Sequence, residues 1–147
     1  MARFTGGEKL NNYLSELAQK VSNPGTLRAG FLGDASYPDG TSVATIAAIQ
    51  NFGAPAAGIP PRPFFSNVVA AGRRKWGDEM AKILVAKDYD AKAALNDMGD
   101  SIKGEIVDSI NNGSYAPLKP ATVRKKGFDK PLVDTAVMVR SVNWEVK

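Results

Sequence analysis

The sequence contains no cysteine and no histidine. Without cysteine, the chain has no disulfides, no thiolate nucleophile and no cysteine-based metal site. Without histidine, it lacks the commonest general base and the commonest zinc ligand. Catalysis would have to rely on a serine–lysine pair or on paired carboxylates, and no spacing in the chain supports either. We therefore expect a protein that is not an enzyme and that needs no cofactor or metal.

Long apolar runs and signal sequences are also missing. No stretch approaches the ~20 apolar residues of a membrane-spanning helix, and residues 1–7 lack the apolar core of a secretory signal. We expect no membrane association and no secretion. The 147 residues, 44% hydrophobic and 23% charged, are typical of one globular domain that spans residues 1–147.

The net charge of +4 is unevenly distributed along the chain. Residues 62–75 carry four cations and no acid, and residues 119–130 carry five cations against one acid. Two basic segments on an otherwise acidic chain predict an acidic partner, which is either a protein surface or a nucleic acid.

Apolar periodicity predicts the secondary structure. It indicates helices over residues 8–21, 43–52, 63–85 and 90–110, with short helical segments at 120–126 and 132–139. Alternation of apolar and polar residues predicts strands at 26–32 and 142–146. Gly53 is expected to end the second helix in a left-handed conformation, and residues 54–61 are expected to be extended. Side-chain caps are expected at Thr41 or Ser42 and at Asp134 or Thr135.

These elements predict an α+β fold. A small sheet is built from strands that are distant in the sequence, and it packs on several helices, one or two of them long. A two-stranded sheet is marginal alone, so it must pack on these helices or gain strands from a neighbouring subunit.

The segment Ile59-Pro60-Pro61-Arg62-Pro63-Phe64-Phe65 is the sharpest local feature. Its prolines, Pro61 among them, stiffen the chain, so that little entropy is lost when it docks. The guanidinium of Arg62 can hold a carboxylate or a carbonyl. Phe64 and Phe65 point about 100° apart on a helix, so one can enter the core while the other contacts a partner. A plain helix start with an apolar plug is the alternative, and the two readings are compatible.

The first basic group surrounds a tryptophan. Cations beside an aromatic ring can bind nucleic acid, and this description fits Arg73, Arg74, Lys75 and Trp76. We favour the alternative of a solvated helical face, with Trp76 in the core and the cations paired with Asp78 and Glu79.

The second basic group lies in the connection over residues 114–131, and it comprises Lys119, Arg124, Lys125 and Lys126. Nucleic acid and an acidic protein surface both remain open as its partner. We favour a protein, because no aromatic residue is interleaved with the cations. The loop over residues 33–41, with the turn Tyr37-Pro38-Asp39-Gly40, is a second candidate for partner contacts.

Several motifs in a fixed order resemble the tail-completion, neck or head–tail joining proteins of tailed bacteriophages, which are also described as virion morphogenesis proteins or tail components. They are Tyr37-Pro38-Asp39-Gly40-Thr41-Ser42-Val43-Ala44, a helix ending at Asn51-Phe52-Gly53, the Ile59–Phe65 segment, Leu118-Lys119-Pro120-Ala121-Thr122 and Lys130-Pro131-Leu132-Val133-Asp134-Thr135. The likeness covers most of residues 26–143. The family usually has glycine after Asp-Thr, where this chain has Ala136, which adopts a positive φ less readily.

The resemblance implies a virion structural protein of the neck or upper tail. Such a protein completes the tail or joins it to the head, and it assembles in the host cytoplasm. The implied partners are further copies of itself, often in a ring, and neighbouring neck or tail proteins, with packaged DNA close by. The alternative function, which rests on the two basic groups, is a small nucleic-acid-binding module.

Overall fold

The computed structural model describes residues 6–127 and 136–147, with the side chain of Lys126 excepted. Along the chain, the elements are α1 (Gly7–Val21), β1 (Leu27–Phe31), α2 (Val43–Phe52), the 3-10 turn η1 (Pro55–Ala57), α3 (Phe64–Ala86), α4 (Ala91–Asn112), α5 (Pro120–Lys126), α6 (Val137–Arg140) and β2 (Val142–Val146). The fold is α+β, as predicted, and both long helices and both strands lie where the periodicity indicates.

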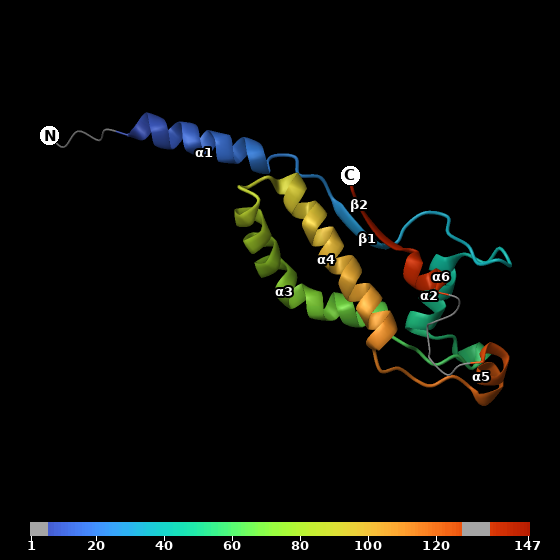
Figure 1. The fold of residues 1–147 in the computed structure, drawn as a ribbon. Helices are drawn as coiled ribbons and strands as arrows, with labels where there is room; N and C mark the ends of the chain where they lie inside the picture. The colour runs from blue at the N-terminus through green and yellow to red at the C-terminus, as the bar shows by residue number, and fades with distance from the viewer. Residues whose placement is uncertain (1–5, 128–135) are drawn as a thin grey trace.

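The helix α4 is the centre of the molecule (Figure 1). It packs along α3 on one side and against both strands on the other, so the order of layers is α3, α4 and the strand pair. The short helices α2 and α6 lie at the end where α4 finishes, and α5 lies beyond them. The largest fully buried side chains come from five different elements and join these layers: Val43, Phe64, Ile106, Ile110, Met138 and Val142.

The two strands pair antiparallel although they are distant in the sequence. Ala29 lies opposite Trp144, and Phe31 lies opposite Val142. The indole of Trp144 rests on Gly99 of α4, where an added Cβ would come within 2.5 Å of the ring. The sheet therefore packs on a helix of its own chain, as one of the two sequence-based alternatives requires.

The segment between α2 and α3 differs from its prediction. Residues 54–61 are expected to be extended, but η1 turns the chain and a bridge pairs Ala54 with Ile59. Gly58 adopts a left-handed conformation (φ 63°, ψ 31°) that closes this turn. Gly53 ends α2 at a positive φ of 77°, but its ψ of 171° is extended rather than left-handed helical.

The turn before α6 contains a non-glycine residue in the left-handed region. Ala136 has φ 59° and ψ 7°, a conformation that costs an L-residue roughly 1–2 kcal/mol. The turn therefore has a positive φ although the residue is not glycine. The expected caps Asp134 and Thr135, and the Lys130–Thr135 motif, lie outside the described residues.

The first helix, α1, extends away from the rest of the molecule (Figure 1). It buries none of its residues. Within the described part of the chain, one ion pair joins it to the body, between Lys20 Nζ and Asp88 Oδ2 at 2.7 Å. Asp88 lies in the turn between α3 and α4. The predicted amphipathic helix therefore forms, but no residue in the ranges 6–127 and 136–147 covers its apolar face.

Over residues 6–127 and 136–147, no helix is both long enough and apolar enough to cross a membrane.

Candidate assembly interface

The start of α3 is capped from another helix. The residue before α3 is Pro63, which has no side-chain hydrogen bond to offer. Asn51 of α2 replaces it: its Oδ1 accepts from the N–H groups of Phe65 (3.1 Å) and Ser66 (3.0 Å), and its Nδ2 donates to Ser66 Oγ at 2.7 Å. These bonds satisfy N–H groups that a helix start otherwise leaves free. Because Asn51 is only 4% exposed, the cap also fixes the angle between α2 and α3.

Arg62, which precedes α3, forms hydrogen bonds to the end of α2 and to the connection that follows α4. Its Nη1 donates to Gln50 Oε1 at 2.7 Å, its Nε donates to the Ala116 carbonyl at 2.8 Å, and its Nη2 donates to the Pro117 carbonyl at 3.2 Å. The side chain is 4% exposed, and its burial lowers the pKa of the guanidinium. Arg62 therefore holds the connection after α4 against the end of α2, through neutral acceptors rather than through a carboxylate.

These positions change the sequence-based interpretation of the Ile59–Phe65 segment. Arg62 and Phe64, predicted to contact a partner, are enclosed by their own chain, with exposures of 4% and 0%. The reason is that Phe64 plugs the core, edge-on to Phe31 with ring centroids 6.1 Å apart. Pro61 is exposed and Phe65 is half-buried, so these two remain accessible. Phe64 enters the core, as predicted for one of the two phenylalanines, and Phe65 packs against the margin of the same core.

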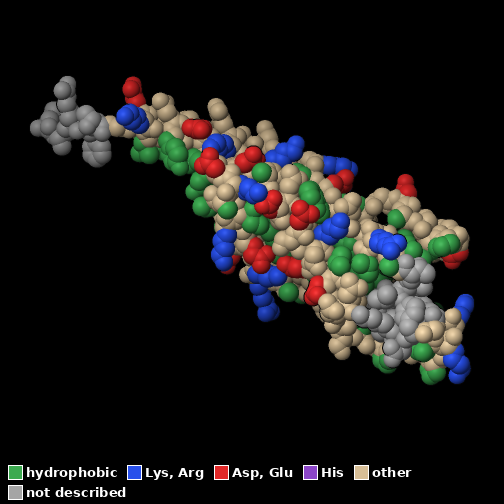
Figure 2. Space-filling view, viewed as in Figure 1, with side chains coloured by type: hydrophobic (Ala, Val, Ile, Leu, Met, Phe, Trp, Pro, Cys, Tyr) green, Lys and Arg blue, Asp and Glu red, His purple; other side chains and the backbone are tan. Residues whose placement is uncertain are grey.

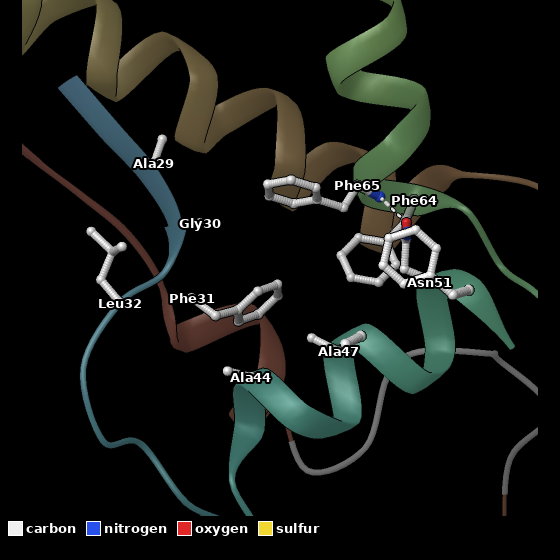
Figure 3. Close-up of a pocket in the computed structure, with 11 residues that line it drawn as sticks. Ala29, Gly30, Phe31, Leu32, Ala44, Ala47, Asn51, Phe64 and Phe65 are labelled. Carbon is white, nitrogen blue, oxygen red and sulfur yellow. Dashed lines mark hydrogen bonds between the residues drawn. The ribbon is translucent and has the colours of Figure 1, made fainter. Parts of the chain in front are cut away.

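An open groove lies beside this joint (Figure 3). Its volume is about 350 Å³, and it is lined by residues 29–32 at the end of β1, by Phe64 and Phe65, and by five residues of α2: Ala44, Ala47, Ala48, Asn51 and Phe52. We call it the β1–α2 groove. None of the eleven lining residues carries a charge. Ten of the eleven lining residues are glycine or have apolar side chains, so a group that enters the groove exchanges water for apolar surface.

The outward face of α2 forms one wall of this groove. Ala44, Ala48 and Phe52 recur every fourth residue, and all three are exposed, with Phe52 at 73%. The whole helix contains no charged residue. The exposed row on α2 is thus an apolar surface that the described residues leave uncovered.

A free sheet edge forms the opposite wall. The backbone bonds Thr26 N to Lys147 O and Lys147 N to Thr26 O fix which strand residues bond across to β2. By alternation, the N–H and C=O groups of Leu27, Ala29 and Phe31 point away from β2. In the described part of the chain, no main-chain bond satisfies these groups. The edge of β1 is therefore open toward the groove.

The basic groups are placed separately. Arg73 and Arg74 are exposed on α3, whereas Lys75 Nζ lies 2.7 Å from Glu105 Oε1 of α4 and 3.8 Å from Glu79. Trp76 packs against the core over Gly72, as the favoured alternative predicts. The structure therefore does not form a stacking platform from Trp76 and its neighbouring cations.

The second basic group lies on α5 and its start. Lys119, Arg124 and Lys125 are exposed and form no ion pair with any residue in the ranges 6–127 and 136–147. The side chain of Lys126 lies outside the described residues. Tyr37 is half-buried and packs against the core, so the loop over residues 33–41 is fastened to the body at that point.

The sequence patterns do not single out the residues that build this candidate interface. The sequence predicts Asn51 and Phe52 as a helix end that belongs to the family-like motif, but it predicts no role for Gln50, Asn51 or Phe52. These residues supply the arginine acceptor, the helix cap and the exposed aromatic side chain. The signal in the sequence that could have indicated this surface is a helix without charged residues that ends in Phe52-Gly53. Searches of protein-family models, curated proteins and solved structures found no match to this chain.

Proposed function

We propose that this chain is a structural subunit that works by protein–protein contacts, as a virion protein of the neck or upper tail of a tailed bacteriophage. The observation that supports this proposal is the pairing of an uncharged, open groove with exposed apolar helix faces. Phe52 is 73% exposed at the groove, and Leu10 is 58% exposed on α1. Extended apolar surfaces on a folded chain mark sites of association.

The polar content of the groove argues against a small-molecule site. Such sites use a few polar groups to orient the ligand, and Asn51 is the one polar side chain in the lining. Its Oδ1 and Nδ2 are already engaged in capping α3. The groove can therefore bury apolar side chains, but it offers no side-chain hydrogen bond to a metabolite.

The position of the family-like motifs supports the phage reading. The motif that ends at Asn51-Phe52-Gly53 and the motif Ile59–Phe65 are separated by residues 54–58 in the sequence, and the cap and the Arg62 bonds join them into one unit at the groove. The residues that carry the resemblance thus include those that build the candidate interface.

Native mass spectrometry tests the proposal, on the purified chain alone and with the neck and tail proteins encoded beside it. We expect a defined oligomer or a defined complex rather than the 15.6 kDa monomer. Phe52→Glu should weaken it, because a carboxylate would enter the uncharged groove. Thr45→Glu, at an exposed residue of α2 outside the groove lining, adds the same charge and should leave it intact. A strict monomer that binds none of these proteins would count against the proposal.

The cations of α5 support a second candidate function, which is nucleic-acid binding. Lys119, Arg124 and Lys125 are exposed, and no carboxylate among the described residues pairs with them. Fluorescence anisotropy with duplex DNA should then show binding that weakens steeply between 50 and 200 mM salt, by roughly tenfold or more for several phosphate contacts. Absence of binding at low salt would remove this candidate.

A further inference from the structure

Uncovered apolar side chains gather at two places in this chain. Four of the six large hydrophobic side chains that are exposed among the described residues belong to α1: Leu10, Tyr13, Leu14 and Val21. A fifth, Phe52, lies on the β1–α2 groove. Figure 2 shows the hydrophobic side chains of α1 along one side of the helix, with charged side chains along the other. The apolar face of α1 is convex, and we call its four exposed residues the α1 ridge. The β1–α2 groove is concave.

The two surfaces cannot meet within one chain. The ion pair between Lys20 and Asp88 joins the end of α1 to the turn between α3 and α4. The groove lies at the far end of the long helices, next to α2 (Figure 1). The helix α1 extends from the opposite end of the molecule, so the length of α4 separates its apolar face from the groove. A second copy of the chain brings both surfaces within reach.

We propose that α1 of one copy docks into the β1–α2 groove of another copy. This inference rests on the proposed assembly function and names the partner and the two surfaces. The contact is heterologous, since different patches meet, so it closes either as a reciprocal exchange between two copies or as a ring.

The chemistry of the two surfaces favours a helix as occupant. Ala44 and Ala48 place small side chains on the outward face of α2. Because the distance between packed helices depends on the side chains at their contact, a second helix can approach this face closely. The residues of the α1 ridge carry no charge, and neither does the groove lining, so no charged group needs to be desolvated at the centre of the contact. The charges of α1, such as Glu16 and Lys20, lie on its flanks and remain in water.

The size of the contact explains why it must be repeated. A 15-residue helix is about 22 Å long and about 10 Å wide, which gives a footprint on the order of 220 Å². A stable pair of proteins buries about 800 Å² on each partner. One arm alone is therefore a weak contact, whereas a closed assembly gives each copy two arm contacts, one as donor and one as acceptor.

Cysteine cross-linking tests the exchange directly, because the natural chain contains no cysteine. Two single variants, Leu14→Cys on the ridge and Ala48→Cys on the groove wall, are expressed with different tags, mixed and oxidised. Any disulfide that joins the two tags must be intermolecular. The matched control replaces Leu14→Cys by Gln19→Cys, which lies on the opposite side of α1. A disulfide requires Cα atoms within about 7 Å, whereas a helix is about 10 Å across.

We expect the mixed-tag disulfide to form with Leu14→Cys and to be lost with Gln19→Cys. Equal cross-linking of the two pairs, or disulfides between two Leu14→Cys chains in place of the mixed product, would overturn the proposal. The first result would indicate random collision, and the second would indicate pairing between two α1 helices.

A charge substitution separates this inference from the proposed function. Leu14→Glu should convert the oligomer to a monomer, and Gln19→Glu should not. Both variants are expected to fold, because α1 contributes no buried residue. If Leu14→Glu keeps the oligomer and the mixed disulfide is absent, the arm exchange is wrong while assembly stands. If the natural chain is monomeric and binds no neck protein, both are wrong.

Discussion

Replacing Arg62 with alanine should destabilise the fold rather than remove a partner contact. The guanidinium makes three hydrogen bonds, to Gln50, Ala116 and Pro117, from a position that is 4% exposed. Hydrogen bonds from a charged donor contribute about 1.5–3 kcal/mol each. The sum is not reached, because the acceptors lie on partly accessible segments and can turn toward water. We therefore expect a loss of about 2–4 kcal/mol in the free energy of unfolding.

Urea unfolding, followed by the fluorescence of Trp76 and Trp144, measures this loss. With a slope of about 2 kcal/mol/M, the midpoint should fall by about 1–2 M. Arg62→Lys keeps the charge but cannot reproduce the planar fork toward three acceptors, so it should recover less than half of the loss. Arg74→Ala removes an exposed cation from α3 and should change the free energy by less than about 0.5 kcal/mol. All variants are compared at one protein concentration, because association shifts apparent stability.

The opposite result has a clear meaning. If Arg62→Ala unfolds within about 0.5 kcal/mol of the natural chain but no longer assembles, the guanidinium is available to a partner. The internal bonds described above would then not be the main role of the side chain.

Four further predictions concern the joints of the fold. Asn51→Ala should lower the free energy of unfolding by about 1–3 kcal/mol by uncapping α3, whereas Asn51→Asp keeps the acceptor and should lose less; both are read from urea midpoints. Gly99→Ala should cost about 1–3 kcal/mol against the indole of β2, while Gly104→Ala, with nothing within 4 Å, should gain about 0.5–1 kcal/mol. Ala136→Gly should raise the stability by about 1 kcal/mol by relieving the positive φ. The hydrogen bond to the Glu105 carboxylate raises the pKa of Lys75 above 10.5. The stabilisation that this pair gives the natural chain over Lys75→Met should therefore be constant from pH 7 to 9 and vanish as the pH rises through that raised pKa.

Elements that follow from local patterns were predictable. The apolar steps of α4 and the alternation in β2 depend on residues within one turn or one strand, so the sequence alone places them. The pairing of Lys75 with Glu79, four residues apart on one helix, is of the same kind. Such features need no knowledge of the tertiary fold.

Contacts between distant segments were not predictable. Asn51 caps a helix that begins 13 residues later, and a capping rule looks only at the residues next to the helix start. The acceptors of Arg62 at Ala116 and Pro117 are backbone carbonyls, which every residue carries, so no residue type marks them. The sequence could therefore show that Arg62 needs a partner, but not that the partner lies inside the same chain.

The same limit applies to α1, and there it leads to assembly. Amphipathic periodicity shows that one face of a helix needs cover, but it does not say which molecule supplies the cover. In α4, the cover is α3 and the strands of the same chain. In α1, the face of Leu10 and Leu14 is more than half exposed, although its periodicity is as regular. An isolated helix of about 15 residues is marginal in water, and the exposed ion pair between Lys20 and Asp88 does little more to hold the 15-residue α1 folded. The docking that covers its ridge would thus stabilise the helix as well as the assembly, and α1 should gain protection from amide hydrogen exchange only in the oligomer.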